Sequence, residues 1–391
     1  MPLTIAVTGQ ALIHQPLQLS AEASLLAHFL SSDATLANFE GVVEAYCAWP
    51  TKTKTVHAVK RDVVRSLAEL GFRAMAHANN HAFDLGPPGI IASRTAFDVH
   101  GMALTGSGND LNEALKPAYI STPQRRISLY SVDLGPQPDI VYAAPTRPGI
   151  APLRLRRRIR LPESEYQMMT SIQQALGDDR RLAARRAVGY SPAQTEGFDA
   201  FGTTFLPGDR VAADWQVDPE DWQQLASRLQ ASRDRNELIV VAIHNHHWDA
   251  DWATTPAWLD ALTDQLVEYG ADLVIGTGAP VMQPMRFHRG RPILSGLGNF
   301  IFHTARSDTY DREGVDVWRS VAVRLTFSDE GLLEHVNVMP IAVGRPSNGE
   351  EADQPMPLEG QDADEIYTRY TSRLLADEEQ LVSRFQPEKA G

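Results

Sequence analysis

Alternation of buried strands with amphipathic helices is the feature that most constrains the fold. Apolar runs such as "LTIAVTG" at residues 3–9, "ELIVVAIH" and "ADLVIG" have the length and composition of buried strands. Between such runs, "AVKRDVVRSLAEL" at 58–70 and "PAWLDALTDQLVEYG" show helical spacing. After residue 290 three strand-like segments follow one another. The pattern predicts a layered α/β protein, with the first strand ending at Gly9.

Composition limits the partners and the compartment. The net charge of −13 argues against nucleic acid as a partner, because phosphates require a basic surface. Cys47 is the single cysteine, which excludes an intrachain disulfide and suits a reducing compartment. The segment "MPLTIAVTGQ" has no basic flank, and no apolar run is long enough to cross a bilayer. We therefore expect a cytoplasmic protein without a membrane partner, and the sequence leaves the oligomeric state open.

Two segments depart from the strand–helix rhythm. Within the main domain expected at 1–343, residues 140–215 lack a strand pattern and are rich in arginine, as in "RLRRRIR". They are interpreted either as a helical insertion with a solvated charged face or as a lid that binds an acidic ligand. Residues 344–391 read as a polar, Pro- and Gly-rich linker followed by a long amphipathic helix.

Polar residues cluster where predicted strands end. In open α/β sheets the carboxyl ends of the strands are where sites assemble. The spacing of His244 and His246 places both on one face of their strand. The residues at these positions are Gln10, Asn38, Glu40, Asn80, His81, Asp84, His244, His246 and Asn299.

Five motifs carry a resemblance to a known family. "NFEG", "ANNHAFDLG", "VVAIHNHHW", "GADLVIG" with "VMQ", and "SGLGNFIF" occur in the order found in the CapA family of poly-γ-glutamate synthesis proteins. That family is part of the calcineurin-like metallophosphatase superfamily. The resemblance runs from about residue 3 to 340. It implies a calcineurin-like four-layer fold, in which a two-sheet β-sandwich is flanked by helices and carries its site at the strand ends.

Departures from the family pattern weaken the hydrolase interpretation. Gln10 stands where the family usually has Asp, and the turn at 277–280 has none of the usual histidines. A two-metal phosphatase needs enough imidazole and carboxylate ligands to hold two cations about 3.5–4 Å apart. The remaining positions that match family ligands are Glu40, Asn80, His244 and Gln10. They predict one divalent cation, with Ca²⁺ preferred and Mg²⁺ or Mn²⁺ possible, because oxygen donors dominate.

Two His–Asp pairs are the predicted acid–base groups. Asp84 follows His81 by three residues and can fix its tautomer. In the superfamily the matching histidine acts as a proton donor near the substrate. Asp249 is the preferred partner of His246, and Asp251 is the alternative.

The whole pattern is most similar to the lasso-peptide epimerase branch of the family. That resemblance implies a metal-dependent epimerase that inverts Cα of the C-terminal residue, a tryptophan, of a ribosomal precursor peptide. Two histidines would act on opposite faces of Cα, without an organic cofactor. A mononuclear hydrolase of phosphoesters or amides stays open, as does a CapA-like protein that binds an acidic polymer or peptide without turning it over.

Overall fold

The computed structural model describes residues 2–18, 24–53, 55–136, 140–191, 193–194, 196–349 and 351–386. These residues form two compact units. The first consists of Met1–Pro152 and Gln223–Gly391, and the second of Leu153–Trp222.

A nine-stranded sheet forms the first half of the sandwich in the first unit, as far as the described residues show. Its order is β26-β24-β23-β1-β3-β6-β7, with β22 also pairing with β1 and β27 with β24. Strands β3, β6 and β22 run parallel to β1 or to each other, so their carboxyl ends meet at one edge. The strands are β1 (Leu3–Leu12), β3 (Ala34–Phe39), β6 (Ala74–Ala76), β7 (Ala103–Thr105), β22 (Asn299–Phe302), β23 (Arg319–Phe327), β24 (Leu333–Ala342), β26 (Met356–Pro357) and β27 (Val382–Arg384).

A six-stranded sheet forms the second half, in the order β19-β20-β17-β16-β10-β9. Its central strands β10, β16 and β17 are parallel, and Asp133, His244 and Thr277 lie in one row at their carboxyl ends. The strands are β9 (Ala118–Ser121), β10 (Arg126–Asp133), β16 (Leu238–His244), β17 (Leu273–Thr277), β19 (Arg286–His288) and β20 (Arg291–Leu294).

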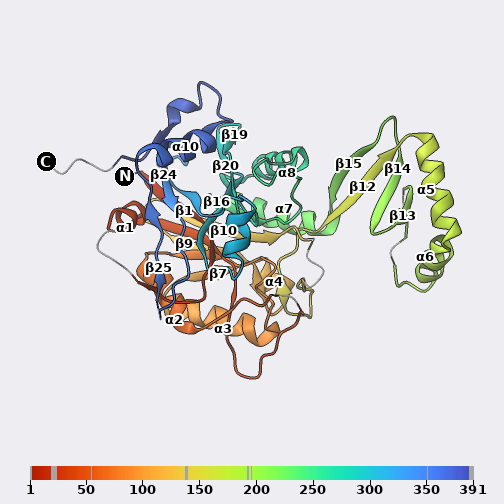
Figure 1. The fold of residues 1–391 in the computed structure, drawn as a ribbon, viewed down its shortest axis with the longest axis horizontal. Coiled ribbons are helices and arrows are strands. Elements are labelled where there is room, and N and C mark those ends of the chain that lie inside the picture. The colour runs from red at the N-terminus through yellow and green to blue at the C-terminus, as the bar shows by residue number, and fades with distance from the viewer. Residues whose placement is uncertain are drawn as a thin grey trace. The chain divides into compact units, whose positions relative to one another are not determined.

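The core lies between these two sheets. Ile5 and Leu36 of the first sheet and Leu129 and Val240 of the second belong to one buried apolar cluster. Helices α2 and α3 lie side by side over the outer face of the first sheet (Figure 1), where Val64 packs in a second cluster. The helices of this unit are α1 (Ser24–Leu30), α2 (Arg61–Glu69), α3 (Gly86–Val99), α4 (Leu111–Ala114), α8 (Ala257–Glu268), α9 (Ser307–Arg312) and α10 (Gly360–Thr371), with α7 (Pro219–Asp234) entering from the second unit.

The layer order of the first unit confirms the predicted α/β sandwich. Helix α8 contacts β17 of the second sheet, and three of its leucines are buried. Apolar side chains therefore alternate between an inner interface of two sheets and outer interfaces with helices. One boundary differs from expectation, because β1 passes Gly9 and continues to Leu12. Gly9 itself approaches the backbone of Gly298 so closely that a Cβ would lie 2.1 Å from its carbonyl oxygen.

Four two-stranded pairings complete the strands described for the first unit. They are β2 (Leu17–Gln18) with β25 (Ala352–Asp353), β4 (Val42–Val43) with β5 (Ala58–Val59), β8 (Ser107–Gly108) with β11 (Gly149–Ile150), and β18 (Met282–Gln283) with β21 (Gly296–Leu297).

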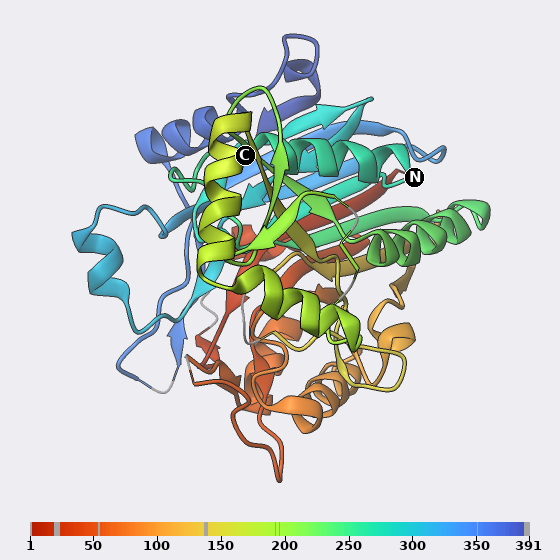
Figure 2. The same ribbon diagram turned by 90° about the vertical axis from the view of Figure 1, so that its right-hand side faces the viewer.

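The second unit overlaps the Arg-rich segment and contains strands that its sequence did not indicate. Its sheet has the order β13-β14-β12-β15. "RLRRRIR" lies mostly within strand β12, so the interpretation as a helical insertion is wrong for this stretch, although helices follow it. Alternate residues Ile159 and Leu161 pack with Phe198 and Phe205 in a small core, to which α5 contributes Tyr166 and Met169. The helices of this unit lie beside its strands (Figure 2). The elements are β12 (Leu155–Leu161), α5 (Glu163–Ala175), α6 (Asp178–Ala187), β13 (Phe198–Ala200), β14 (Thr203–Pro207) and β15 (Ala212–Val217).

The C-terminal segment is more integrated than its composition suggests. The expected linker contributes β25 and β26, and the expected long helix ends at Thr371. A turn of 3₁₀ helix (Glu379–Leu381) and strand β27 then return the chain to β24. Ile366 and Tyr370 of α10 are buried in the core between the sheets. Among the described residues, no helix has both the length and the apolar character that crossing a membrane requires.

Candidate metal centre

A cavity of about 510 Å³ opens where the strand ends of the first unit meet. Five of the expected site residues line it, namely Gln10, Glu40, Asn80, His81 and His246. Its apolar and aromatic lining includes Leu12, Trp248, Pro280, Phe302 and Tyr310.

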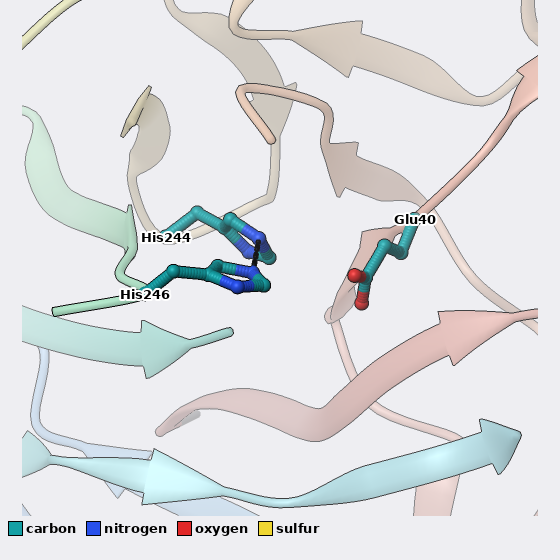
Figure 3. Close-up of side chains that lie close together, drawn as sticks. All are labelled: Glu40, His244 and His246. Atoms are coloured by element: carbon teal, nitrogen blue, oxygen red, sulfur yellow. Dashed lines mark hydrogen bonds between the residues drawn. The ribbon is translucent and has the colours of Figure 1, made fainter. Parts of the chain in front are cut away.

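Glu40, His244 and His246 form the centre of this site. One candidate ligand atom from each lies within 4.8 Å of the other two, and the carboxylate of Glu40 faces the two imidazoles (Figure 3). Glu40 follows β3, while His244 ends β16 and His246 comes two residues later. The sheet topology thus brings together residues about 200 positions apart. This is the arrangement of two imidazoles and one carboxylate that binds transition metals.

Hydrogen bonds orient the possible metal-ligating atoms toward a common point. His244 Nδ1 lies 3.0 Å from Thr277 Oγ1, whose hydroxyl donates to the Ile243 carbonyl. Nδ1 therefore carries the proton, and Nε2 presents its lone pair. That lone pair faces Asn80 Oδ1 at 3.0 Å and His246 Nε2 at 2.9 Å. If Nε2 of His246 also carries its lone pair, these three atoms could share one bound cation.

The ionisation of these groups also fits a cation. Glu40 is buried and its Oε2 atom has no hydrogen-bond partner among the described residues. Burial raises the pKa of Glu40 to about 8, an effect that the charge of Lys52 partly offsets. Burial is the main cause that lowers the pKa of His244 well below its usual range, and the neighbouring His246 and His81 lower it further. Burial also lowers the pKa of His246 to about 3. Neutral imidazoles are the form that ligates metals.

His81 and Asp84 make the predicted contact beside this centre. Nδ1 of His81 lies 2.8 Å from Asp84 Oδ2 and 3.2 Å from Lys52 Nζ. In the tautomer with the proton on Nδ1, the carboxylate accepts that proton and Nε2 is left as the base. Lys52 was not foreseen from the sequence. Its ammonium lies 2.6 Å from Asp84 Oδ1 and donates to the Asn80 carbonyl at 2.9 Å. Burial and then Lys52 lower the pKa of His81 well below its usual range.

Two further histidines, His57 and His14, belong to this region, although no motif in the sequence singled them out. His57 lines the cavity, and its backbone N–H donates to Asp84 Oδ2 at 2.8 Å. Its ring lies 4.0 Å from that of His81 and forms a 2.9 Å hydrogen bond with His14. Both Lys52 and His57 come from the loop between β4 and β5, which carries no motif of its own.

Gln10 has a supporting position in this geometry. Its Oε1 accepts from the Gly278 N–H at 3.0 Å, and its Nε2 donates to Asn299 Oδ1 at 2.9 Å. Gly278 has a φ of +103°, and a Cβ there would lie 2.3 Å from the Asn245 carbonyl oxygen, so only glycine fits this turn. The amide of Gln10 thus ties β1 to the turn after β17. Its expected role as a metal ligand stays a prediction.

The second expected His–Asp pair is not brought together. Asp249 is exposed and makes no hydrogen bond with the described residues. Asp251 instead accepts from the Ala253 N–H and the Thr254 hydroxyl in its own turn. What lies against His246 is Trp248, whose ring stacks on the imidazole at 4.9 Å.

Asp133 is a buried carboxyl at this strand edge that the sequence did not single out. It is the ladder partner of His244, and its Oδ2 accepts from the Gly135 N–H and the Tyr142 hydroxyl. Burial raises its pKa to about 7. Its position at the end of the strand "ISLYSVD" could have predicted its place in the site, because the other site residues also lie at or just after strand ends.

Comparison with known proteins gives one family and several distant relatives. The family described as bacterial capsule synthesis protein PGA_cap matches residues 4–304. An uncharacterized protein of Sinorhizobium fredii is 25% identical over 270 residues, which are 66% of this chain and 56% of that protein. A probable polyglutamine synthesis accessory protein of Mycobacterium tuberculosis is 24% identical over 334 residues, 83% of this chain and 70% of that protein.

The PGA biosynthesis protein CapA of Bacillus subtilis is 22% identical over 285 residues, covering 72% of this chain and 57% of that protein. The chain thus spans a little over half the length of the Sinorhizobium and Bacillus relatives.

Proposed function

This chain belongs to the bacterial capsule synthesis protein (PGA_cap) family, and from that premise and its site we propose that it is a metal-dependent peptide epimerase. Its reaction would invert Cα of the C-terminal residue of a precursor peptide, with an aromatic residue such as tryptophan preferred.

The observation that carries the proposal is that one group of possible metal ligands lies beside one acid–base pair, His81 and Asp84. Glu40, His244 and His246, with Asn80, offer donors for one cation. Among the described residues no second cluster of His, Cys, Asp or Glu could hold another. A site for one cation does not suit the two-metal hydrolysis of phosphoesters, which needs a second cation to hold the leaving oxygen.

Residues outside the metal cluster would remove and deliver the protons. A bound divalent cation would supply a Lewis acid that stabilises negative charge beside Cα. His81 Nε2 can remove the Cα proton, because Asp84 holds the proton of Nδ1. His246 lies within the donor set, so a second group must deliver a proton to the other face. Tyr310 lines the same cavity, and burial raises its pKa, so its hydroxyl keeps a proton to donate.

The donor set changes the preferred metal. The expectation of Ca²⁺ rested on oxygen ligands, whereas two imidazoles now join one carboxylate and one amide oxygen. Imidazole nitrogen favours borderline transition metals. We propose Mn²⁺, Fe²⁺ or Zn²⁺ as the ion.

The aromatic part of the cavity supports an aromatic substrate side chain. Trp248 stacks on His246, and the rings of Phe302 and Tyr310 lie 5.6 Å apart in the same cavity. Ring surfaces next to the metal cluster would hold an indole by offset stacking.

The test follows hydrogen exchange at Cα. The metal-loaded protein is incubated in D₂O with linear precursor peptides that end in tryptophan, and mass spectrometry and chiral chromatography follow the terminal residue. One deuterium incorporated with inversion, lost in His81→Ala and Glu40→Gln, is the expected result. No exchange in any metal-loaded sample would contradict the proposal.

One acid–base pair beside one metal site also suits an amide hydrolase, since a single histidine can protonate a leaving amine. Release of a shortened peptide in the same incubation, without deuterium at Cα, would identify that reaction instead.

A further inference from the structure

Arg306 is a cation without a partner at the cavity. It directly precedes α9, its side chain is exposed, and it lines the cavity together with Thr304 and Tyr310. Its backbone N–H donates to the Thr304 hydroxyl at 3.1 Å. Its guanidinium makes no hydrogen bond or ion pair with any residue in the described ranges.

Nearby cations are neutralised within the fold. Lys52, the other cation that lines the cavity, is paired with Asp84 at 2.6 Å. Arg312, at the end of α9, pairs with Glu313 at 3.1 Å. Carboxylates outnumber cationic side chains in this chain, whose net charge is −13, yet none of them in the described ranges pairs with the Arg306 guanidinium.

The surrounding charges favour an anion at Arg306. Glu40 would be balanced by a bound cation. Arg306 also acts on Tyr310, because its charge lowers the tyrosine pKa that burial raises. The guanidinium therefore acts on the proposed proton donor, and Glu40 is the one carboxylate among the described residues that line this cavity.

We propose that Arg306 binds the free carboxylate of the substrate's terminal residue and so makes the site specific for chain ends. The planar guanidinium can donate two parallel hydrogen bonds to a carboxylate. With the carboxylate held there, the terminal side chain can reach the rings of Phe302 and Trp248. This inference rests on the proposed function, since it names what that site selects.

The test measures binding of small probes to the full-length, metal-loaded protein by calorimetry. The probes are N-acetyl-tryptophan, its C-terminal amide, and inorganic phosphate. We expect the acid to bind about 10- to 100-fold more tightly than the amide, the usual effect of a charge-assisted hydrogen-bonded pair. Arg306→Gln should remove this preference by weakening the acid alone. Arg312→Gln, on the same helix and outside the cavity, should leave both affinities unchanged.

Three results would overturn the inference. Arg306→Gln could bind the acid as tightly as the unaltered protein does, or it could lose the acid and the amide equally. Phosphate could bind through Arg306 while the carboxylate probe does not, which would make a phosphate group the ligand.

The binding test is independent of turnover. A carboxylate preference that disappears in Arg306→Gln, with no deuterium exchange in any peptide, would support Arg306 as the anchor and reject the epimerase. Exchange that proceeds equally in the peptide acid and the peptide amide would support the epimerase and reject the anchor.

Discussion

His81 Nδ1 and Asp84 Oδ2 lie 2.8 Å apart in a buried pair beside the candidate metal centre. The carboxylate fixes the imidazole as the tautomer whose Nε2 carries the lone pair. Asp84→Asn removes the anion that stabilises this tautomer and the charged imidazole that forms on proton uptake. We expect kcat for deuterium exchange at Cα to fall about 10²- to 10⁴-fold, with little change in KM.

A matched variant separates this effect from a general loss of stability. Asp98→Asn changes an exposed carboxylate on α3, the helix that follows the His81 loop. Its exchange rate and unfolding temperature should equal those of the unaltered protein. If Asp84→Asn kept the full exchange rate, the pair would be structural and His81 would not be the base.

Metal removal should lower stability as well as activity. A ligand that binds only the folded state stabilises it by about 2.7 kcal/mol at a concentration 100 times its Kd. EDTA should therefore lower the unfolding temperature, and Mn²⁺ or Zn²⁺ should restore it more than Ca²⁺ does. His246→Ala should abolish the restoration, whereas His100→Ala, at the end of α3, should not. A larger effect of Ca²⁺ would support the original preference for an oxygen-ligand site.

The sequence predicted those parts of the site that depend on strand ends. Glu40 follows β3, and His244 ends β16 two residues before His246. Parallel strands bring their carboxyl ends to one edge, so the position of each residue in its own strand was sufficient. The contact of His81 with Asp84 was likewise predictable from a spacing of three residues.

The rest depends on contacts between segments far apart in the chain. Lys52 reaches the Asn80 carbonyl across 28 positions, from a loop whose path no local signal specifies. Asp249 is an error of the other kind, because it is close to His246 in sequence and yet its exposed side chain does not bond to the imidazole. Strand β12, which holds most of "RLRRRIR", forms because its alternate residues Ile159 and Leu161 pack with apolar residues of α5 and of neighbouring strands. Such partners are tertiary features that override local composition.

Gln10 and Asn80 should separate structural support from metal ligation. Gln10→Ala leaves the Gly278 N–H and Asn299 Oδ1 without the partners they now have. Each buried group that loses its partner costs about 1–3 kcal/mol. We expect the free energy of unfolding to fall by about 2–4 kcal/mol, equally with and without metal, in a denaturant titration.

Asn80→Ala should do the reverse, with a small change in stability and a loss of metal affinity of about tenfold or more. If Gln10→Ala weakened metal binding as much as Asn80→Ala did, Gln10 would be a ligand as the family resemblance implied.

Glu237 provides a test of stability away from the metal centre. It is buried at the start of β16, next to Arg126, Ser128 and Arg235, which all donate to its carboxylate. Burial alone would raise the pKa of Glu237, but the hydrogen bonds from Arg235, Ser128, Ser232 and Arg126 outweigh burial and lower it to about 2. A carboxyl with a lowered pKa in the folded state stabilises the protein whenever it is ionised.

This stabilisation should be complete above about pH 4.5, the pKa of an unfolded glutamate, and should be lost as the pH falls toward 2. Glu237→Gln should therefore reduce the free energy of unfolding by about 2 kcal/mol at pH 7, a value discounted because its arginine partners are partly exposed. The difference between the two proteins should shrink steadily between pH 4.5 and pH 2 in urea titrations. Glu334→Gln, which changes an exposed carboxylate on β24, should show no such difference at any pH. A Glu237→Gln deficit that stayed constant down to pH 2 would mean that packing, not ionisation, accounts for the contribution of Glu237.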